Sequence, residues 1–210
     1  MNIGILGAGK VGGTLGTAWA RKGHRIRFGV RRHDSPEIKE LLRKIGPLAS
    51  AGSVEEAASF GEAILLATPW PAAEEVLRGA GDLTGKILLD CMNPLKPGLA
   101  GLSIGTTTSA GEMVAQWAPG ARVVKIFNTN GSENMGNPNY PLGPATMFYC
   151  GDDEGAKLAA AQLASDTGAE PVDAGPLSNA RLLEPLAMLW IWLAVFGGMG
   201  RNIAFKLIRR

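Results

Sequence analysis

Short runs of apolar residues alternate along the chain with longer segments in which apolar residues recur every three or four positions. The short runs predict strands and the longer segments predict amphipathic helices. The expected strands are Met1–Leu6, Arg25–Val30, Ala63–Thr68, Ile87–Asp90, Arg122–Phe127, Thr146–Cys150 and Pro171–Ala174. The expected helices are Lys10–Lys22, Pro36–Lys44, Pro71–Arg78, Ser109–Trp117, Asp153–Ser165 and Asn179–Ile208. This alternation predicts an α/β fold, a doubly wound and mostly parallel sheet covered by helices on both faces.

The last part of the chain has a different pattern, because the run Leu186–Gly200 (LAMLWIWLAVFGGMG) is apolar throughout. A membrane-spanning helix requires about 20 such residues, and this run has 15. The length favours a helix buried in the protein or at a subunit interface. Trp190, Trp192 and Phe196 are spread around more than one helix face, so one packed stripe would leave apolar surface uncovered. We expect residues 1–178 to form the α/β domain and residues 179–210 a C-terminal helical appendage.

Three glycines, Gly7, Gly9 and Gly12, form the pattern GxGxxG between the first expected strand and the first expected helix. In that context the pattern is typical of a Rossmann-type dinucleotide site. Gly7 permits a tight turn, Gly9 lets a pyrophosphate approach the backbone, and Gly12 lets the helix lie close to the sheet. Free N–H groups at the helix start would bind the phosphates. A purely structural glycine turn remains the alternative.

Two arginines, Arg31 and Arg32, follow the second expected strand at the position where NAD-binding proteins carry an acidic residue. A carboxylate there binds the ribose 2′-OH of NAD, whereas arginine accommodates the 2′-phosphate of NADP. Guanidinium groups bind phosphate through charge-assisted, bidentate hydrogen bonds. The pair predicts NADP(H) as cofactor, and a solvated basic turn is the alternative.

The next two expected strands end in the turns TPW (68–70) and DCMNP (90–94). Both turns should lie at the carboxyl edge of the sheet, beside the nicotinamide half of the cofactor. Thr68 and Asn93 could hydrogen-bond the ribose or the carboxamide, while Pro69, Trp70 and Pro94 could form an apolar wall. Core packing explains Trp70 equally well.

Composition excludes several other classes of protein. Lys+Arg 21 against Asp+Glu 19 gives a formal net charge of +2, so no general binding to nucleic acid or to a membrane surface is expected. Cys91 and Cys150 form no CxxC pair and the chain has 2 histidines, so neither a disulfide framework nor a metal site is predicted. The N-terminal residues predict a strand rather than a signal peptide, and we expect a cytoplasmic protein.

Motifs distributed along the chain carry a family resemblance: GILGAGKVG, LATPW, GTTTSAGEMVA, ARVVKIFNT, CGDDE and above all DAGPLSNARLLEPL. The sequence resembles the deazaflavin-dependent NADP oxidoreductases, which exchange hydride between NADPH and 8-hydroxy-5-deazaflavin (coenzyme F420). It is also similar to the cytosolic NADPH domain of the six-transmembrane epithelial antigen of prostate metalloreductases. The resemblance implies a homodimer in which the C-terminal helices (residues 179–210) pack together and help close the acceptor pocket. It also implies a pyrophosphate site at Gly7, Gly9, Lys10, Val11 and Gly12, a 2′-phosphate site at Arg31 and Arg32, and a nicotinamide site at Thr68, Pro69, Asn93 and Pro94. Val30 departs from the family, in which a small hydroxyl residue is expected.

Direct hydride transfer requires two stacked rings and exclusion of water, so no catalytic acid or base is predicted. Lys125 is expected to be structural and Cys91 to be a small buried residue. The loop FNTNGSEN offers Asn128, Thr129 and Asn130 as hydrogen-bonding groups for the acceptor ring. An Asn/Gly-rich turn selected only for its backbone geometry is the alternative.

Three functions remain open from the sequence. The first is an NADPH-dependent oxidoreductase that reduces a deazaflavin or a flavin (FMN or FAD), with ferric reduction through a flavin as a variant. The second is a dehydrogenase of a small hydroxy or imino acid, for which the chain after Ala174 is too short to supply a substrate domain. The third is a non-enzymatic dinucleotide-binding or electron-relay subunit.

Overall fold

Eight strands form one sheet in the order β10-β9-β6-β5-β4-β1-β2-β3 in the computed structural model, which describes all 210 residues. The six strands from β3 to β6 run parallel, β9 pairs antiparallel with β6, and β10 runs parallel to β9. The strands are β1 (Asn2–Leu6), β2 (Arg25–Gly29), β3 (Ala49–Gly52), β4 (Ala63–Leu66), β5 (Ile87–Asp90), β6 (Arg122–Lys125), β9 (Thr146–Gly151) and β10 (Glu170–Asp173). This sheet confirms the prediction of a Rossmann-type, doubly wound and mostly parallel fold.

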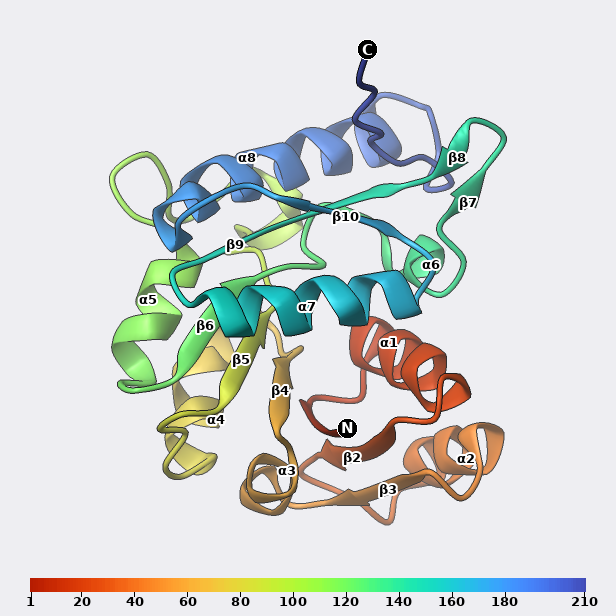
Figure 1. Cartoon of the computed structure of the whole chain (residues 1–210), viewed down its shortest axis with the longest axis vertical. Helices are drawn as coiled ribbons and strands as arrows, with labels where there is room; N and C mark the ends of the chain where they lie inside the picture. Colours follow the sequence, from red (N-terminus) through yellow and green to blue (C-terminus); the bar gives the residue numbers. More distant parts are fainter.

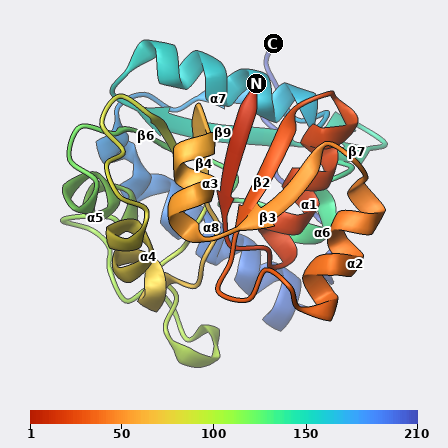
Figure 2. The same cartoon turned by 90° about the horizontal axis from the view of Figure 1, so that it is seen from below.

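Helices cover both faces of the sheet because its buried residues alternate in direction along each strand. Ile3 and Ile5 of β1 pack with α1 and α7 on one face, while Leu6 packs with α3 and α4 on the other. Figure 2 shows α1 and α2 on one side of the strands and α4 and α5 on the other. The helices are α1 (Lys10–Arg21), α2 (Pro36–Ile45), α3 (Val54–Phe60), α4 (Ala73–Gly79), α5 (Ala110–Trp117), α6 (Ser132–Met135), α7 (Glu154–Asp166) and α8 (Ala180–Ile191). Short 3₁₀ turns occupy Trp70–Ala72, Pro97–Leu99 and Leu177–Asn179.

Several short elements were not predicted from the sequence. β3 consists of the small residues ASAG and lacks the branched or aromatic side chains that mark a strand. α3 has only 7 residues, although Ser53 and Glu56 form a capping box that signals its start. The two-stranded hairpin β7 (Asn139–Tyr140) and β8 (Gly143–Pro144), together with α6, lies in a segment that was expected to be loop.

The expectation of one helix over Asn179–Ile208 was wrong at its C-terminal end. α8 ends at Ile191, and a π-helical turn continues it to Phe196. Gly198 and Gly200 then adopt positive φ angles of 74° and 73°, which end the helix. The remaining tail returns along β9, where Thr146 N donates to Phe205 O at 3.0 Å. In Figure 1, α8, the tail and the β7–β8 hairpin lie at one end of the molecule, and α2 and β3 lie at the other.

The helical stretch Leu177–Phe196 has 20 residues and is long and apolar enough, by length and composition, to cross a membrane. Helical residues before Leu186 therefore make the segment longer than the 15-residue apolar run, and its length does not exclude a membrane-spanning helix. Glu184 lies in the middle of this stretch with 1% exposure, and its carboxylate is bonded inside the protein.

Candidate functional site

The glycine turn lies between β1 and α1, at the point where strand order reverses between β1 and β4. Gly7 has φ 109°, and a Cβ there would lie 2.5 Å from Ala67 O. A Cβ on Gly12 would lie 2.1 Å from Gly7 O, so only glycine lets α1 start this close to β1. Gly9, the N-cap of α1, has no atom within 4 Å of an added Cβ and makes no side-chain cap. The turn thus leaves open space over an uncapped helix N-terminus, and that arrangement fits a pyrophosphate.

Lys10 and Val11 form the first turn of α1, where Lys10 is exposed and Val11 is half-buried. No acidic residue lies in that turn. The predicted pyrophosphate residues are therefore contiguous in space as well as in sequence.

Arg31 and Arg32 follow β2 and are both exposed. Neither guanidinium takes part in an ion pair or a side-chain hydrogen bond, whereas five other arginines of the chain form ion pairs. Because their donors are free, both side chains can bind an external anion. Their place at the end of β2, beside the glycine turn, is where the 2′-phosphate of NADP lies in this fold.

Thr68 lies against the glycine turn, with its Cγ2 3.5 Å from the position of a Cβ on Gly7. Its hydroxyl contacts Met92 Sδ at 3.6 Å, which links the turns that follow β4 and β5. Pro69 is exposed. Trp70 is stacked on Trp117 of α5, with ring centroids 5.1 Å apart. The indole of Trp70 is thus held by packing, as the alternative interpretation of the sequence allowed.

Asn93 and Asn128 are bonded directly to each other, which the sequence did not reveal. Asn93 Nδ2 donates to Asn128 O at 2.9 Å, and Asn128 Nδ2 donates to Asn93 Oδ1 at 3.0 Å. Asn128 Nδ2 also donates to Leu183 O of α8 at 3.1 Å. The residues predicted for the nicotinamide and for the acceptor ring are therefore parts of one network, and Pro94 next to Asn93 is buried.

The three polar residues proposed for the acceptor are buried, with exposures of 4% for Asn128, 3% for Thr129 and 8% for Asn130. Asn128 Oδ1 and Asn130 Nδ2 have no hydrogen-bond partner. Buried polar atoms without partners are uncommon and are often functional. None of these three residues is among those that line the cleft between α8 and the loop that follows β5.

Phe127 directs the chain into this loop from a strained backbone conformation. Phe127 is fully buried and has φ 63°. Its ring packs edge-on against the ring of Trp19, with ring centroids 5.6 Å apart. A bulky residue with positive φ costs about 1 to 3 kcal/mol and persists only where packing enforces it. The packing of Phe127 thus fixes the direction of Asn128 at the end of β6.

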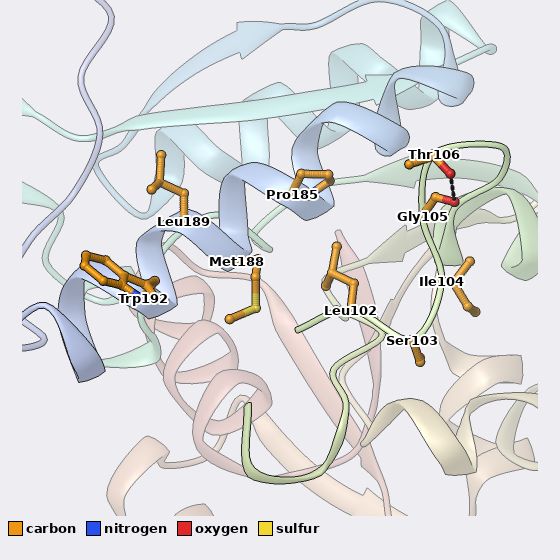
Figure 3. Close-up of a pocket in the computed structure, with 9 residues that line it drawn as sticks. All are labelled: Leu102, Ser103, Ile104, Gly105, Thr106, Pro185, Met188, Leu189 and Trp192. Atoms are coloured by element: carbon orange, nitrogen blue, oxygen red, sulfur yellow. Dashed lines mark hydrogen bonds between the residues drawn. The ribbon is translucent and has the colours of Figure 1, made fainter. Parts of the chain in front are cut away.

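A cleft of about 560 Å³ lies between α8 and the loop that follows β5. In Figure 3, Met188 of α8 and Trp192 of the π-helical turn that follows it line one side, and Leu102 and Ile104 line the other. None of its lining residues is charged; they are Leu102, Ser103, Ile104, Gly105, Thr106, Pro185, Met188, Leu189 and Trp192. Long loops at the carboxyl ends of strands commonly line the ligand crevice of a doubly wound sheet. The C-terminal helix was expected to help close the acceptor pocket, but its lining residues were not named individually, since their pattern indicates only an apolar helix.

A fully buried ion cluster lies beneath these elements. Lys125 Nζ is 3.0 Å from Asp90 Oδ2 and 2.9 Å from Glu184 Oε1, and it also donates to Met92 O at 2.5 Å. Burial alone would lower the pKa of Lys125, but the carboxylates of Asp90 and Glu184 outweigh it and hold the pKa above the ordinary lysine value. Lys125 is therefore a buried and charged member of this cluster, and its purely structural role stays a prediction.

Other groups with catalytic potential are also held in place. Burial raises the pKa of the Cys91 thiol well above its usual range, and its Sγ lies 3.2 Å from Leu66 O. Asp90 accepts from Met92 N at 2.9 Å, as expected for a capping carboxylate. Nowhere in the chain do three or more His, Cys, Asp or Glu side chains lie close enough together to bind a metal ion.

Comparisons with known proteins agree with this geometry. Residues 2–94 match the family model described as coenzyme F420-dependent NADP oxidoreductase. A solved structure from Arthrobacter sp. FB24, provisionally named an F420-dependent NADP reductase, is 32% identical, with a TM-score of 0.89 and 99% of each chain covered. Metalloreductase STEAP3 of Rattus norvegicus is 30% identical over 192 residues, 90% of this chain, and the chain spans 37% of that protein's length.

An imine reductase of Streptomyces aurantiacus shares the fold, with a TM-score of 0.67 at 19% identity over 94% of this chain and 64% of that one. The full-length match to the Arthrobacter structure and the family model both point to the same redox family. The chain therefore belongs to the coenzyme F420-dependent NADP oxidoreductase family and is an NADP-dependent oxidoreductase with a Rossmann fold.

Proposed function

We propose that the protein transfers a hydride directly between NADP(H) and a deazaflavin or flavin ring, with coenzyme F420 as first candidate and FMN or FAD as the others. The observation that carries this proposal is the uncharged cleft between α8 and residues 102–106. β1, β4 and β5 are parallel, so the glycine turn and the start of the cleft loop lie at the same edge of the sheet. A dinucleotide on the glycine turn would place its nicotinamide beside an apolar cleft that suits a flat ring.

The residues of the site would bind the cofactor, orient its nicotinamide ring and exclude water. Free N–H groups of α1 and the guanidiniums of Arg31 and Arg32 would hold the phosphates, while Thr68, Pro69, Asn93 and Pro94 would flank the nicotinamide. Leu102 and Met188 would keep water from the reacting rings. Bound NADPH supplies the hydride, so no side chain has to move a proton in the chemical step.

A second candidate is ferric reduction through a flavin, and the similarity to Metalloreductase STEAP3 favours it. In that case iron would be a substrate that receives electrons from the flavin. A non-enzymatic relay function is less favoured, because the open cleft offers a site for a small-molecule acceptor.

Spectrophotometric NADPH oxidation distinguishes these candidates, with coenzyme F420, FMN, FAD and ferric citrate supplied separately and ferric citrate also combined with FMN. The proposal predicts that NADPH is oxidised when a deazaflavin or a flavin is the only acceptor, and that it is not oxidised by ferric citrate alone. Ferric reduction only in the presence of FMN would favour the second candidate. If NADPH binds but no acceptor oxidises it, the non-enzymatic relay function would be the remaining candidate.

We further propose a cytoplasmic homodimer in which residues 179–210 form the interface and one side of the acceptor site. Leu189, Trp192, Phe196 and Met199 are large apolar residues with 49% to 62% exposure on α8 and the turn that follows it. An exposed apolar surface of this kind on a soluble protein marks a contact site. The buried carboxylate of Glu184 is bonded within the protein, which supports a helix packed on its own sheet rather than one in a bilayer.

Trp192→Asp is expected to shift the dimer toward monomer or aggregate, because it places a charge on the proposed interface without altering a buried contact. Sedimentation velocity at micromolar concentration measures the change. A wild-type protein that sediments as a monodisperse monomer without detergent would contradict the dimer, as would recovery only from membranes.

A further inference from the structure

The two sides of the acceptor cleft belong to segments far apart in the sequence, yet one buried polar network ties both to the sheet. The α8 side begins at Pro185, directly after Leu183 and Glu184. The loop side ends at Leu102 and Ser103, which return to the end of β5. The width of the cleft therefore depends on contacts that do not line it.

On the α8 side, the carboxylate of Glu184 contacts three donors on two different elements. Oε1 contacts Lys125 Nζ of β6 at 2.9 Å and accepts from Gly111 N at 3.1 Å, while Oε2 accepts from Ala110 N at 3.0 Å. Both N–H groups belong to the first turn of α5, where backbone donors are otherwise unsatisfied. Glu184 thus fixes α8 to the end of β6 and to the start of α5 at one point.

On the loop side, Lys125 Nζ binds Asp90 Oδ2 and Met92 O at the end of β5. Asn93, next in the chain, is bonded to Asn128. Pro94 O then accepts from both the amide N and the hydroxyl of Ser103, at 2.7 and 2.9 Å. This path runs without interruption from Glu184 to the cleft residue Ser103.

We infer that Glu184 is a positioning residue for the redox reaction: acting through Lys125 and the start of α5, it sets the position of α8 and thereby the width of the acceptor cleft. The inference rests on the proposed function, since it assigns the acceptor ring to that cleft. The phosphate site for NADP(H) does not depend on Glu184, because the glycine turn lies between β1 and α1 and Arg31–Arg32 follow β2, outside the network.

Glu184→Gln tests this with minimal change of shape. All three bonds need oxygen acceptors, and an amide offers only one oxygen, so at least one bond must be lost. Loss of one buried hydrogen bond to a charged group should raise the acceptor KM about tenfold. The dissociation constant for NADPH, measured by its fluorescence, should stay within about twofold of wild type because the phosphate site is unchanged.

Glu112→Gln is the matched control. Glu112 also joins α5 to α8, through two hydrogen bonds from Arg181 at 2.8 and 2.6 Å, but it has no contact with the buried network. Its replacement removes a comparable link between helices. The acceptor KM of this variant should equal that of the wild type.

Gly111→Ala is a second variant, which keeps every charge in place. A Cβ at this position would lie 3.1 Å from Ala180 Cβ and 3.6 Å from Lys125 Cδ, so α8 must move away from α5 by a few tenths of an ångström. Alanine is otherwise favourable in a helix. This variant should raise the acceptor KM, as Glu184→Gln does. It tests the same inference if Glu184→Gln does not fold.

The measurements use NADPH oxidation with coenzyme F420 and with FMN, at a temperature where circular dichroism shows each variant to be folded. A raised acceptor KM in Glu184→Gln or Gly111→Ala, but not in Glu112→Gln, with NADPH affinity retained, supports the inference. Equal acceptor KM values in folded Glu184→Gln and Glu112→Gln would overturn this inference, as would a loss of NADPH affinity that parallels the rise in acceptor KM. Neither result would overturn the proposed function. A wild-type protein that reduces neither acceptor overturns the proposed function and this inference together.

Discussion

Replacing both Arg31 and Arg32 by alanine is expected to weaken NADPH binding by about 2 to 4 kcal/mol, because charge-assisted hydrogen bonds to the 2′-phosphate are lost. NADH has no such phosphate, so its affinity should remain nearly unchanged. Both arginines are exposed and free of ion pairs, and the fold should therefore be unaffected. Isothermal titration with each nucleotide measures the difference.

Arg21→Ala with Lys22→Ala is the control for net charge. These residues are exposed at the C-terminal end of α1 and make no ion pair. The control removes the same two charges far from the glycine turn. Equal losses for NADPH and NADH in the Arg31–Arg32 variant, or an equal loss of NADPH affinity in the control, would refute the assignment.

Replacing Lys125 by methionine is expected to lower the free energy of unfolding by about 3 to 5 kcal/mol, because it leaves the buried carboxylates of Asp90 and Glu184 without their cation. The pKa of Lys125 is raised in the folded protein, so its stabilising contribution is fully present below the ordinary lysine value of 10.5. That contribution is lost only as pH rises through the folded pKa. The contribution of Lys125 to the wild-type protein should therefore be fully present at neutral pH, where urea unfolding of both proteins measures the difference.

Lys157→Met is the matched control for that variant. Lys157 also bridges two carboxylates, at 2.6 Å from Glu154 and 3.0 Å from Asp173, but both of these partners are exposed to solvent. Water can solvate them when the lysine is removed, so the loss should be much smaller. A Lys125→Met variant no less stable than the Lys157→Met variant would show that the buried cluster contributes little.

The sequence predicted those parts of the fold whose signals are local. The glycine turn was identifiable because Gly7, Gly9 and Gly12 stand between a strand and a helix, and the structure places them so. β3 was not predicted from the sequence, because its stability comes from pairing with β2, for example between Ala49 and Ile26, and not from its own side chains. The end of α8 was mislocated because hydrophobicity continues past Phe196, whereas Gly198 and Gly200 end the helix by their backbone conformation.

The candidate site was predictable only in its outline. Thr68 and Asn93 were placed at strand ends from their positions in the chain, but the reciprocal bonds of Asn93 and Asn128 join residues 35 apart. The role of Glu184 was hidden for the same reason, since its partners Lys125 and Gly111 lie far away in the sequence. Contacts across such separations are set by the topology of the sheet, which one sequence does not reveal residue by residue.

The most direct test of the central claim follows the transferred hydrogen itself. NADPH carrying deuterium at C4, on one face or the other in separate reactions, is oxidised by the protein with coenzyme F420 in ordinary water, and the reduced deazaflavin is analysed by mass spectrometry. Direct transfer between stacked rings predicts that deuterium from one face alone appears at the carbon-bound position of the reduced ring. A reduced ring that carries only solvent hydrogen with both labelled forms would contradict direct hydride transfer.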